Sequence, residues 1–219
     1  MPDLNFQIEG AEPQRYAASP HLLFKLRITE AGTLGEEATP IHAVALRCQV
    51  RIEPALRRYS PAEQRRLVDL FGTPDRWGQT LRSMFWADVN TVVPSFRGCG
   101  TADLSVPCSY DFCLAATKYF AALDDGDIPI CFLFSGTIFY ESPGRGLQVS
   151  QVPWDREASF RLPAAAWSQL MDLYYPNCAW LCLRKDIFDA LNHYRSRHSL
   201  PTWEQTIERL LGNEEALKA

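Results

Sequence analysis

The sequence has no hydrophobic run long enough to cross a membrane, and its first residues lack the basic segment and apolar stretch of a secretory signal. These absences predict a cytoplasmic protein with no membrane span. An excess of positive charge is also missing, since 22 lysines and arginines stand against 26 aspartates and glutamates. Neutralising nucleic-acid phosphates requires a basic surface, so this balance argues against a nucleic-acid-binding protein.

Enzyme motifs are equally scarce. No glycine-rich phosphate loop is present, and Ser135 lacks the preceding glycine of a nucleophile elbow. His193 and His198 are five residues apart, so they would not share a helix face. We therefore expect no catalytic residue and no cofactor, which favours a non-enzymatic protein.

The residues that are present favour strands. From Leu22 to Thr29, and again from His42 to Glu53, apolar residues alternate with polar ones, as in strands that bury one face. The second alternation places His42 on the inner face, where we expect a core residue. Two such strands predict an antiparallel sheet with one solvent-exposed face.

The segment from Ile128 to Trp154 predicts a hairpin. Apolar residues occupy both parities between Ile128 and Tyr140, which is typical of a central strand buried on both faces. Pro143, Gly144 and Gly146 predict a turn, and alternation resumes after it in a return strand.

Helices are predicted between and after these strands. Ser60, Pro61 and Glu63 match a capping box at the start of a short helix. Residues 111–123 fit helical spacing better than alternation, with a strand as the alternative, and three amphipathic helices follow Trp154.

These elements predict an α+β fold: an antiparallel β-sheet or sandwich-like core with inserted short helices and a C-terminal helical segment. We expect a single domain, 1–219, in which a strand-rich core (1–160) carries a helical segment (161–219) packed on it.

Seven cysteines are scattered among apolar neighbours, which is typical of reduced buried thiols. Cys178 and Cys182 are four residues apart and would share a helix face, so they are candidate metal ligands. A structural metal site needs four ligands and no second pair is in view. We therefore expect no bound metal.

One surface can be named from alternation alone. Lys25 and Arg27 share the outer face of one predicted strand, and Arg47 and Arg51 share that of the next. If these strands are neighbours, four positive charges gather on one face of the sheet. Acidic residues of the same sheet or of a partner protein must then balance these charges. Because aromatic residues and arginines dominate protein interfaces, the six Trp, eight Tyr and twelve Phe also favour a protein partner.

Five segments, spread in order over nearly the whole chain, resemble an uncharacterised bacterial family, one of the domains of unknown function: LRCQVRIEP, LFGTPDRWGQTLRSMFW, VPCSYDF, LFSGTIF and VPWDREASFRLPAAAW. Genes of that family tend to lie beside those of a NiFe-hydrogenase of the actinobacterial type. The resemblance implies a hydrogenase-associated protein whose partners are hydrogenase subunits or maturation factors. It supplies no catalytic or ligand residues.

Three functions stay open. The first is an accessory or protein-interaction protein that serves a hydrogenase system in assembly or attachment. The second is a chaperone-like binding module for unfolded segments, and the third is a cysteine-dependent metal carrier or enzyme. Co-purification separates the first two, because an accessory protein brings down one complex and a chaperone brings down many clients.

Overall fold

The computed structural model describes residues 2–32, 38–179 and 181–218. The chain divides into two compact units, Met1–Cys178 and Ala179–Ala219. The first unit contains an antiparallel sheet with short helices, and the second contains two helices. The predicted α+β fold is confirmed, whereas the single domain of residues 1–219 stays a prediction.

The described residues form nine strands, all in the first unit: β1 (Leu4–Pro13), β2 (His21–Glu30), β3 (Pro40–Ile52), β4 (Met84–Val93), β5 (Phe96–Arg97), β6 (Cys99–Pro107), β7 (Asp127–Ser142), β8 (Gly146–Gln151) and β9 (Glu157–Pro163). The helices of the first unit are η2 (Pro54–Leu56), α1 (Pro61–Arg66), α2 (Val68–Phe71), η3 (Pro74–Arg76), α3 (Trp77–Thr80), α4 (Leu114–Ala121) and α5 (Ala164–Tyr174). The second unit contains α6 (Lys185–Arg197) and α7 (Trp203–Lys218). Among the described helices, none is long and apolar enough to cross a membrane.

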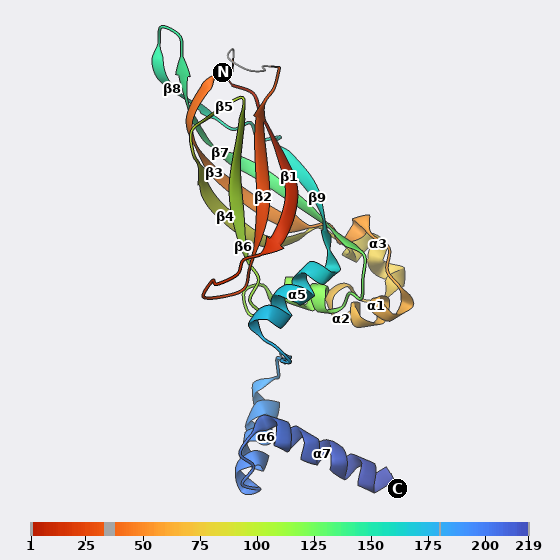
Figure 1. Ribbon diagram of the computed structural model, residues 1–219. Coiled ribbons are helices and arrows are strands. Elements are labelled where there is room, and N and C mark those ends of the chain that lie inside the picture. The colour runs from red at the N-terminus through yellow and green to blue at the C-terminus, as the bar shows by residue number, and fades with distance from the viewer. Residues whose placement is uncertain (1, 33–37, 180, 219) are drawn as a thin grey trace. The chain divides into compact units, whose positions relative to one another are not determined.

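The sheet follows the order β1-β2-β6-β5-β3-β7-β8, with β4 paired to β3 and β9 paired to β7. All neighbouring strands are antiparallel. The sheet curls until β9 lies beside β1 (Figure 1). Arg156, just before β9, and Asp3, just before β1, form an ion pair in which Nη2 and Oδ1 are 2.5 Å apart, and this pair joins the two strands. Strand β1 is thereby covered, and β8 is left at an edge.

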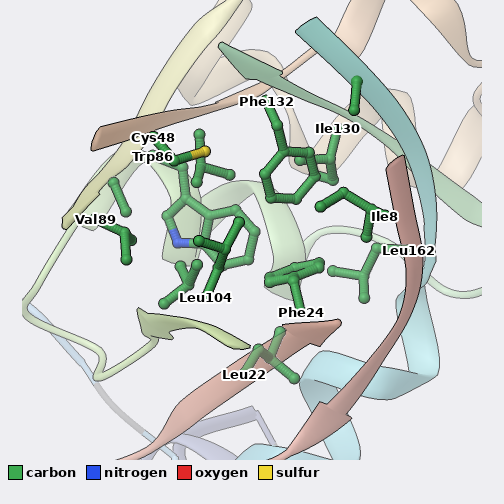
Figure 2. Packing of buried hydrophobic residues seen from close by; sticks show 14 of the residues in the cluster. Ile8, Leu22, Phe24, Cys48, Trp86, Val89, Leu104, Ile130, Phe132 and Leu162 are labelled. Atoms are coloured by element: carbon green, nitrogen blue, oxygen red, sulfur yellow. The ribbon is translucent and has the colours of Figure 1, made fainter. Parts of the chain in front are cut away.

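The inward faces of the strands share one core (Figure 2). Phe24 of β2 lies among its aromatic rings, with centroids 5.0 Å from Phe132 and 6.0 Å from Trp86 in edge-on contacts. Leu104 of β6 and Leu162 of β9 are also fully buried in this cluster. Side chains from strands distant in the sequence therefore complete a single hydrophobic core.

The alternation predicted for β2 and β3 is confirmed with one correction. The register between β3 and β7 shifts between Ile41 and Ala43, which marks a bulge. The bulge turns Ile41 into the core and His42 outward, with His42 Nε2 3.8 Å from Glu141 Oε2. The prediction of a core His42 is wrong, because strict alternation does not account for the extra residue of a bulge.

Strand β7 is central in its pairing but not in its burial. It pairs with β3 along one edge and with β9 and then β8 along the other. Phe132 and Phe134 point into the core, whereas Leu133 and Phe139 on the opposite face are only half-buried. The prediction of burial on both faces is therefore wrong, because the outer face stays partly open to solvent.

Two helix predictions are confirmed. Ser60 Oγ accepts a hydrogen bond from Glu63 N, and Glu63 Oε2 accepts one from Ser60 N at 2.7 Å, which completes the capping box of α1. The ambiguous segment 111–123 contains α4 and is helical. Helix α5 belongs to the first unit, where Trp167 and Leu170 are buried.

Candidate functional site

Strand β8 is a free edge of the sheet. It pairs with β7 from Thr137↔Gln151 to Ser142↔Gly146, and no strand within the described ranges pairs with its other side. The β7–β8 hairpin extends from the body of the first unit (Figure 1). The sequence of β8 itself, GLQVSQ, contains neither proline nor a charged residue, and these are the residues that usually protect an exposed edge. The strand is short, but its edge is open to pairing with another chain.

The backbone groups that face this edge follow from one hydrogen bond. Val152 N donates to Gly136 O at 2.9 Å, in the same register as the β7–β8 pairs. In an antiparallel ladder, hydrogen-bonded pairs alternate with pairs that are not bonded to each other. The backbone groups of Ser150 therefore face β7, and those of Leu147 and Val149 point to the open edge.

The same two residues carry exposed apolar side chains on the outer face of the sheet. Leu147 is 61% exposed and Val149 is 56% exposed. Val149 lies opposite Phe139 of β7, which in turn lies opposite Ala43 of β3. Val92 of β4, 68% exposed, lies one row further along this face. We call these five residues the outer patch.

Polar groups lie at two ends of the outer patch. Arg47 Nε donates to Asp88 Oδ1 at 2.9 Å, and the guanidinium holds the pKa of the Asp88 carboxyl below its ordinary value. His42 and Glu141 lie beside the opposite end of the row. An apolar centre with a polar rim is the usual composition of a protein interface.

Gly136 positions the hairpin. It lies where the outer edge of β7 changes its partner from β9 to β8, and its φ is 146°. A Cβ at this position would lie 2.1 Å from the carbonyl oxygen of Ala45 on β3. Only glycine permits this close approach of β7 to β3, so Gly136 fixes the place where β8 begins to pair.

The four cations predicted to share one face do not lie on neighbouring strands. Strand β2, with Lys25 and Arg27, pairs with β1 and β6. Strand β3, with Arg47 and Arg51, pairs with β4, β5 and β7. The expectation of neighbouring strands is wrong, because β2 and β3 follow each other in the sequence but are separated by β6 and β5 in the sheet.

Acidic residues of the same sheet form ion pairs with the two cations of β2. Lys25 Nζ lies 3.0 Å from Glu12 Oε1 and 3.1 Å from Asp103 Oδ1, and its hydrogen bonds to these carboxylates raise its pKa. Arg27 Nη1 lies 2.9 Å from Glu9 Oε1. These cations already have partners on the strands beside them.

The two cations of β3 are also held within the sheet. Arg51 Nε donates to Ser83 Oγ at 2.8 Å, and Ser83 Oγ donates to Glu53 Oε1 at 2.5 Å. Arg47 pairs with Asp88 and is the cation that borders the outer patch. A role for the four cations in partner binding stays a prediction.

Cys178 and Cys182 do not share a helix face. Helix α5 ends at Tyr174, before Pro176, and both cysteines are exposed in irregular segments. The expectation that helical spacing joins them is therefore wrong. In the part of the chain that the structure describes, no three His, Cys, Asp or Glu residues gather as metal ligands.

A buried polar cluster joins α1 to the loop before β7. Arg57 Nη2 lies 2.8 Å from Glu63 Oε1, and their side chains are only 7% and 3% exposed. Glu63 Oε1 also accepts from Asp124 N at 3.2 Å. The hydroxyls of Tyr59 and Tyr119 are 2.8 Å apart, and burial raises the pKa of Tyr59 and raises that of Tyr119 to about 12. These groups bond to one another, which is typical of a structural cluster.

The sequence predicted the return strand but not the outer patch. One available signal was that the residues from Gly146 to Gln151 are uncharged and place Leu147 and Val149 on one face. Val92 had no comparable signal, because its place in the patch depends on the pairing of β4 with β3.

A protein-family model described as "Family of unknown function (DUF6084)" matches residues 1–219. No curated protein matches the chain. One similar solved structure is the solution structure of a late embryogenesis abundant (LEA) protein, with 14% sequence identity and a TM-score of 0.30, covering 74% of this chain and 73% of that chain. At this TM-score the similarity carries no inference about function.

Proposed function

The chain belongs to the family of unknown function DUF6084, and from the geometry of its sheet we propose a non-enzymatic protein-interaction protein. Its outer patch and free β8 edge bind an extended segment of another protein. The observation that carries the proposal is that Leu147 and Val149 combine outward backbone groups with exposed apolar side chains.

Strand addition uses both features. An extended segment beside β8 forms main-chain hydrogen bonds with the open edge, and its side chains alternate between the two faces of the sheet. Those on the outer face meet the outer patch. We therefore expect the bound segment to carry apolar residues at every second position and no proline where its N–H pairs with β8.

The test uses a phage-displayed library of random peptides selected on the full chain. We expect the selected peptides to alternate apolar and polar residues. Hydrogen exchange followed by NMR then identifies the binding edge. On peptide binding, the amides of Leu147 and Val149 should gain protection, while the amide of Ser150, which already faces β7, should change little. Protection gained elsewhere on the sheet, or peptides without alternation, would contradict the proposal.

Two variants separate the backbone from the side chain. Val149→Pro removes an N–H that faces the open edge and should abolish peptide binding while the β7–β8 ladder remains. Val149→Ala keeps that N–H and should weaken binding by roughly tenfold, because only part of an apolar contact is lost. Leu173→Ala, at an exposed position of α5, is the matched control and should bind as the unchanged protein does. Equal binding by Val149→Pro would refute strand addition.

The proposed partners are the hydrogenase subunits or maturation factors that the sequence resemblance implies, met in the cytoplasm. A chaperone-like module is the second candidate, because an extended segment bound mainly through its backbone is recognised with little sequence preference. Peptides that tile hydrogenase subunits, compared with peptides from unrelated unfolded proteins, distinguish the two. Binding of one hydrogenase segment supports an accessory protein, and equal binding of many unrelated segments supports a chaperone.

A further inference from the structure

The second unit has almost no core of its own. Among its side chains described in residues 181–212, only Thr206 is buried. Phe188 of α6 and Trp203 of α7 contact each other, with ring centroids 5.3 Å apart, yet Phe188 stays exposed. Two helices of this size do not bury enough apolar surface to be stable alone. Their apolar faces therefore need a further layer.

Both helices carry the spacing of a helical bundle. The apolar residues of each helix follow one another at intervals of four and three, which places them on one stripe. The residues at these intervals are Ile187, Leu191 and Tyr194 in α6 and Trp203, Ile207 and Leu210 in α7. Leu211 widens the stripe of α7, and it is exposed together with Ile187 and Ile207. A partner with matching stripes would cover these residues.

The two helices have opposite net charge. By sequence, α6 contains three basic and two acidic residues, and α7 contains two basic and four acidic residues. In a two-fold symmetric dimer, if α6 of the first copy contacts α7 of the second copy, then α6 of the second copy also contacts α7 of the first copy. Pairing α6 of one copy with α7 of the next therefore places opposite charges together at both contacts.

We propose that the second unit is a dimerisation element that binds the same unit of a second copy. The α6 and α7 helices of the two copies then form a four-helix bundle in which the apolar stripes face one another. The dimer joins two β8 edges in one assembly, so a partner with two binding segments would be held more tightly than by one chain. The bundle does not depend on what the β8 edge binds.

The experiment measures the molar mass of the full chain by sedimentation equilibrium over a range of concentrations. We expect a dimer. Ile207→Glu combined with Leu211→Glu places charge in the proposed seam and should give a monomer with the melting temperature of the first unit unchanged. Leu173→Glu, at an exposed position of α5 in the first unit, is the control and should remain dimeric.

Because the double glutamate variant can unfold its helices, a second variant tests the charge pattern. Arg197 is exposed in α6, and Arg197→Glu should raise the dimer dissociation constant roughly tenfold at low salt while Arg197→Lys leaves it unchanged. The proposal would be overturned if the unchanged protein were a monomer. If the double variant also had a lower melting temperature than that monomer, the helices would cover another part of their own chain, and the proposal would be overturned in the same way. An unaffected dimer in both the double variant and Arg197→Glu would overturn it equally.

Discussion

Replacing Glu63 with alanine should destabilise the first unit strongly, because this carboxylate serves a buried cation and two backbone amides. Its Oε1 accepts from Arg57 Nη2 at 2.8 Å and from Asp124 N at 3.2 Å, and its Oε2 accepts from Ser60 N at 2.7 Å. Arg57 Nη1 already has no hydrogen-bond partner within the described residues. The variant would leave this guanidinium buried with still fewer partners.

The magnitude follows from what remains after the change. An arginine stays charged at all accessible pH values, so Arg57 cannot escape the loss by releasing a proton. Removing one partner of a buried ion pair costs about 3 to 5 kcal/mol, because the other charge is left uncompensated. Half of the capping box is lost as well, which contributes up to about 1 kcal/mol. We expect Glu63→Ala to lower the free energy of unfolding by about 4 kcal/mol.

Urea unfolding, followed by the fluorescence of buried tryptophans such as Trp86, measures this loss. Ser60→Ala removes only the cap and should cost about 1 kcal/mol. Asp69→Ala, an exposed acid in the first turn of α2 in the first unit, is the matched control and should change stability by less than about 0.5 kcal/mol. Arg57→Leu combined with Glu63→Leu should recover most of the loss, since no charge is then buried. A loss below about 1 kcal/mol for Glu63→Ala would show that water reaches Arg57 and would refute the reasoning.

Three further outcomes are expected. Phe134 is only 2% exposed, so Phe134→Ala should lower the free energy of unfolding, measured in urea, by about 3 to 5 kcal/mol. Leu147→Ala, at an exposed position, should lower it by less than about 0.5 kcal/mol. Equal losses for the two variants would contradict the difference in burial. The folded pKa of Asp88 is lowered by its arginine partner, so its stabilisation is present above the unfolded pKa and is lost as pH falls through the folded pKa. The difference in melting temperature between the unchanged protein and Asp88→Asn should therefore shrink as the solution is acidified, and a constant difference would contradict this. Burial raises the pKa of Cys108 to about 12, so its thiol should not react with iodoacetamide at neutral pH while the protein is folded. Mass spectrometry of the labelled peptides should show label on the exposed Cys178 in the folded protein and on Cys108 only after denaturation. Labelling of Cys108 in the folded protein would count against its burial.

Local spacing in the sequence was enough to predict several elements correctly. The alternation around Lys25 and Arg47 identified the inner and outer faces of β2 and β3. The types and spacing of Ser60 and Glu63 identified the capping box, because its two hydrogen bonds join residues three positions apart. Periodicity also favoured the helix at Leu114–Ala121 over a strand. Each of these features depends on residues close together in the chain.

Tertiary structure decided which strands are neighbours and therefore where the candidate site lies. Alternation assigns a residue to a face but does not identify the strand beside it, so the cations of β2 and β3 were expected together although the sheet separates them. The same limit applies to β7, whose two apolar faces do not indicate that its outer face is left partly open. The bulge that turns His42 outward and the free edge beside Val149 both depend on pairing between distant segments. Hydrogen bonds between strands join segments that are distant in the sequence. For this reason the sequence alone determined which residues share a face of the sheet, while only the fold determined which strand lies at its edge.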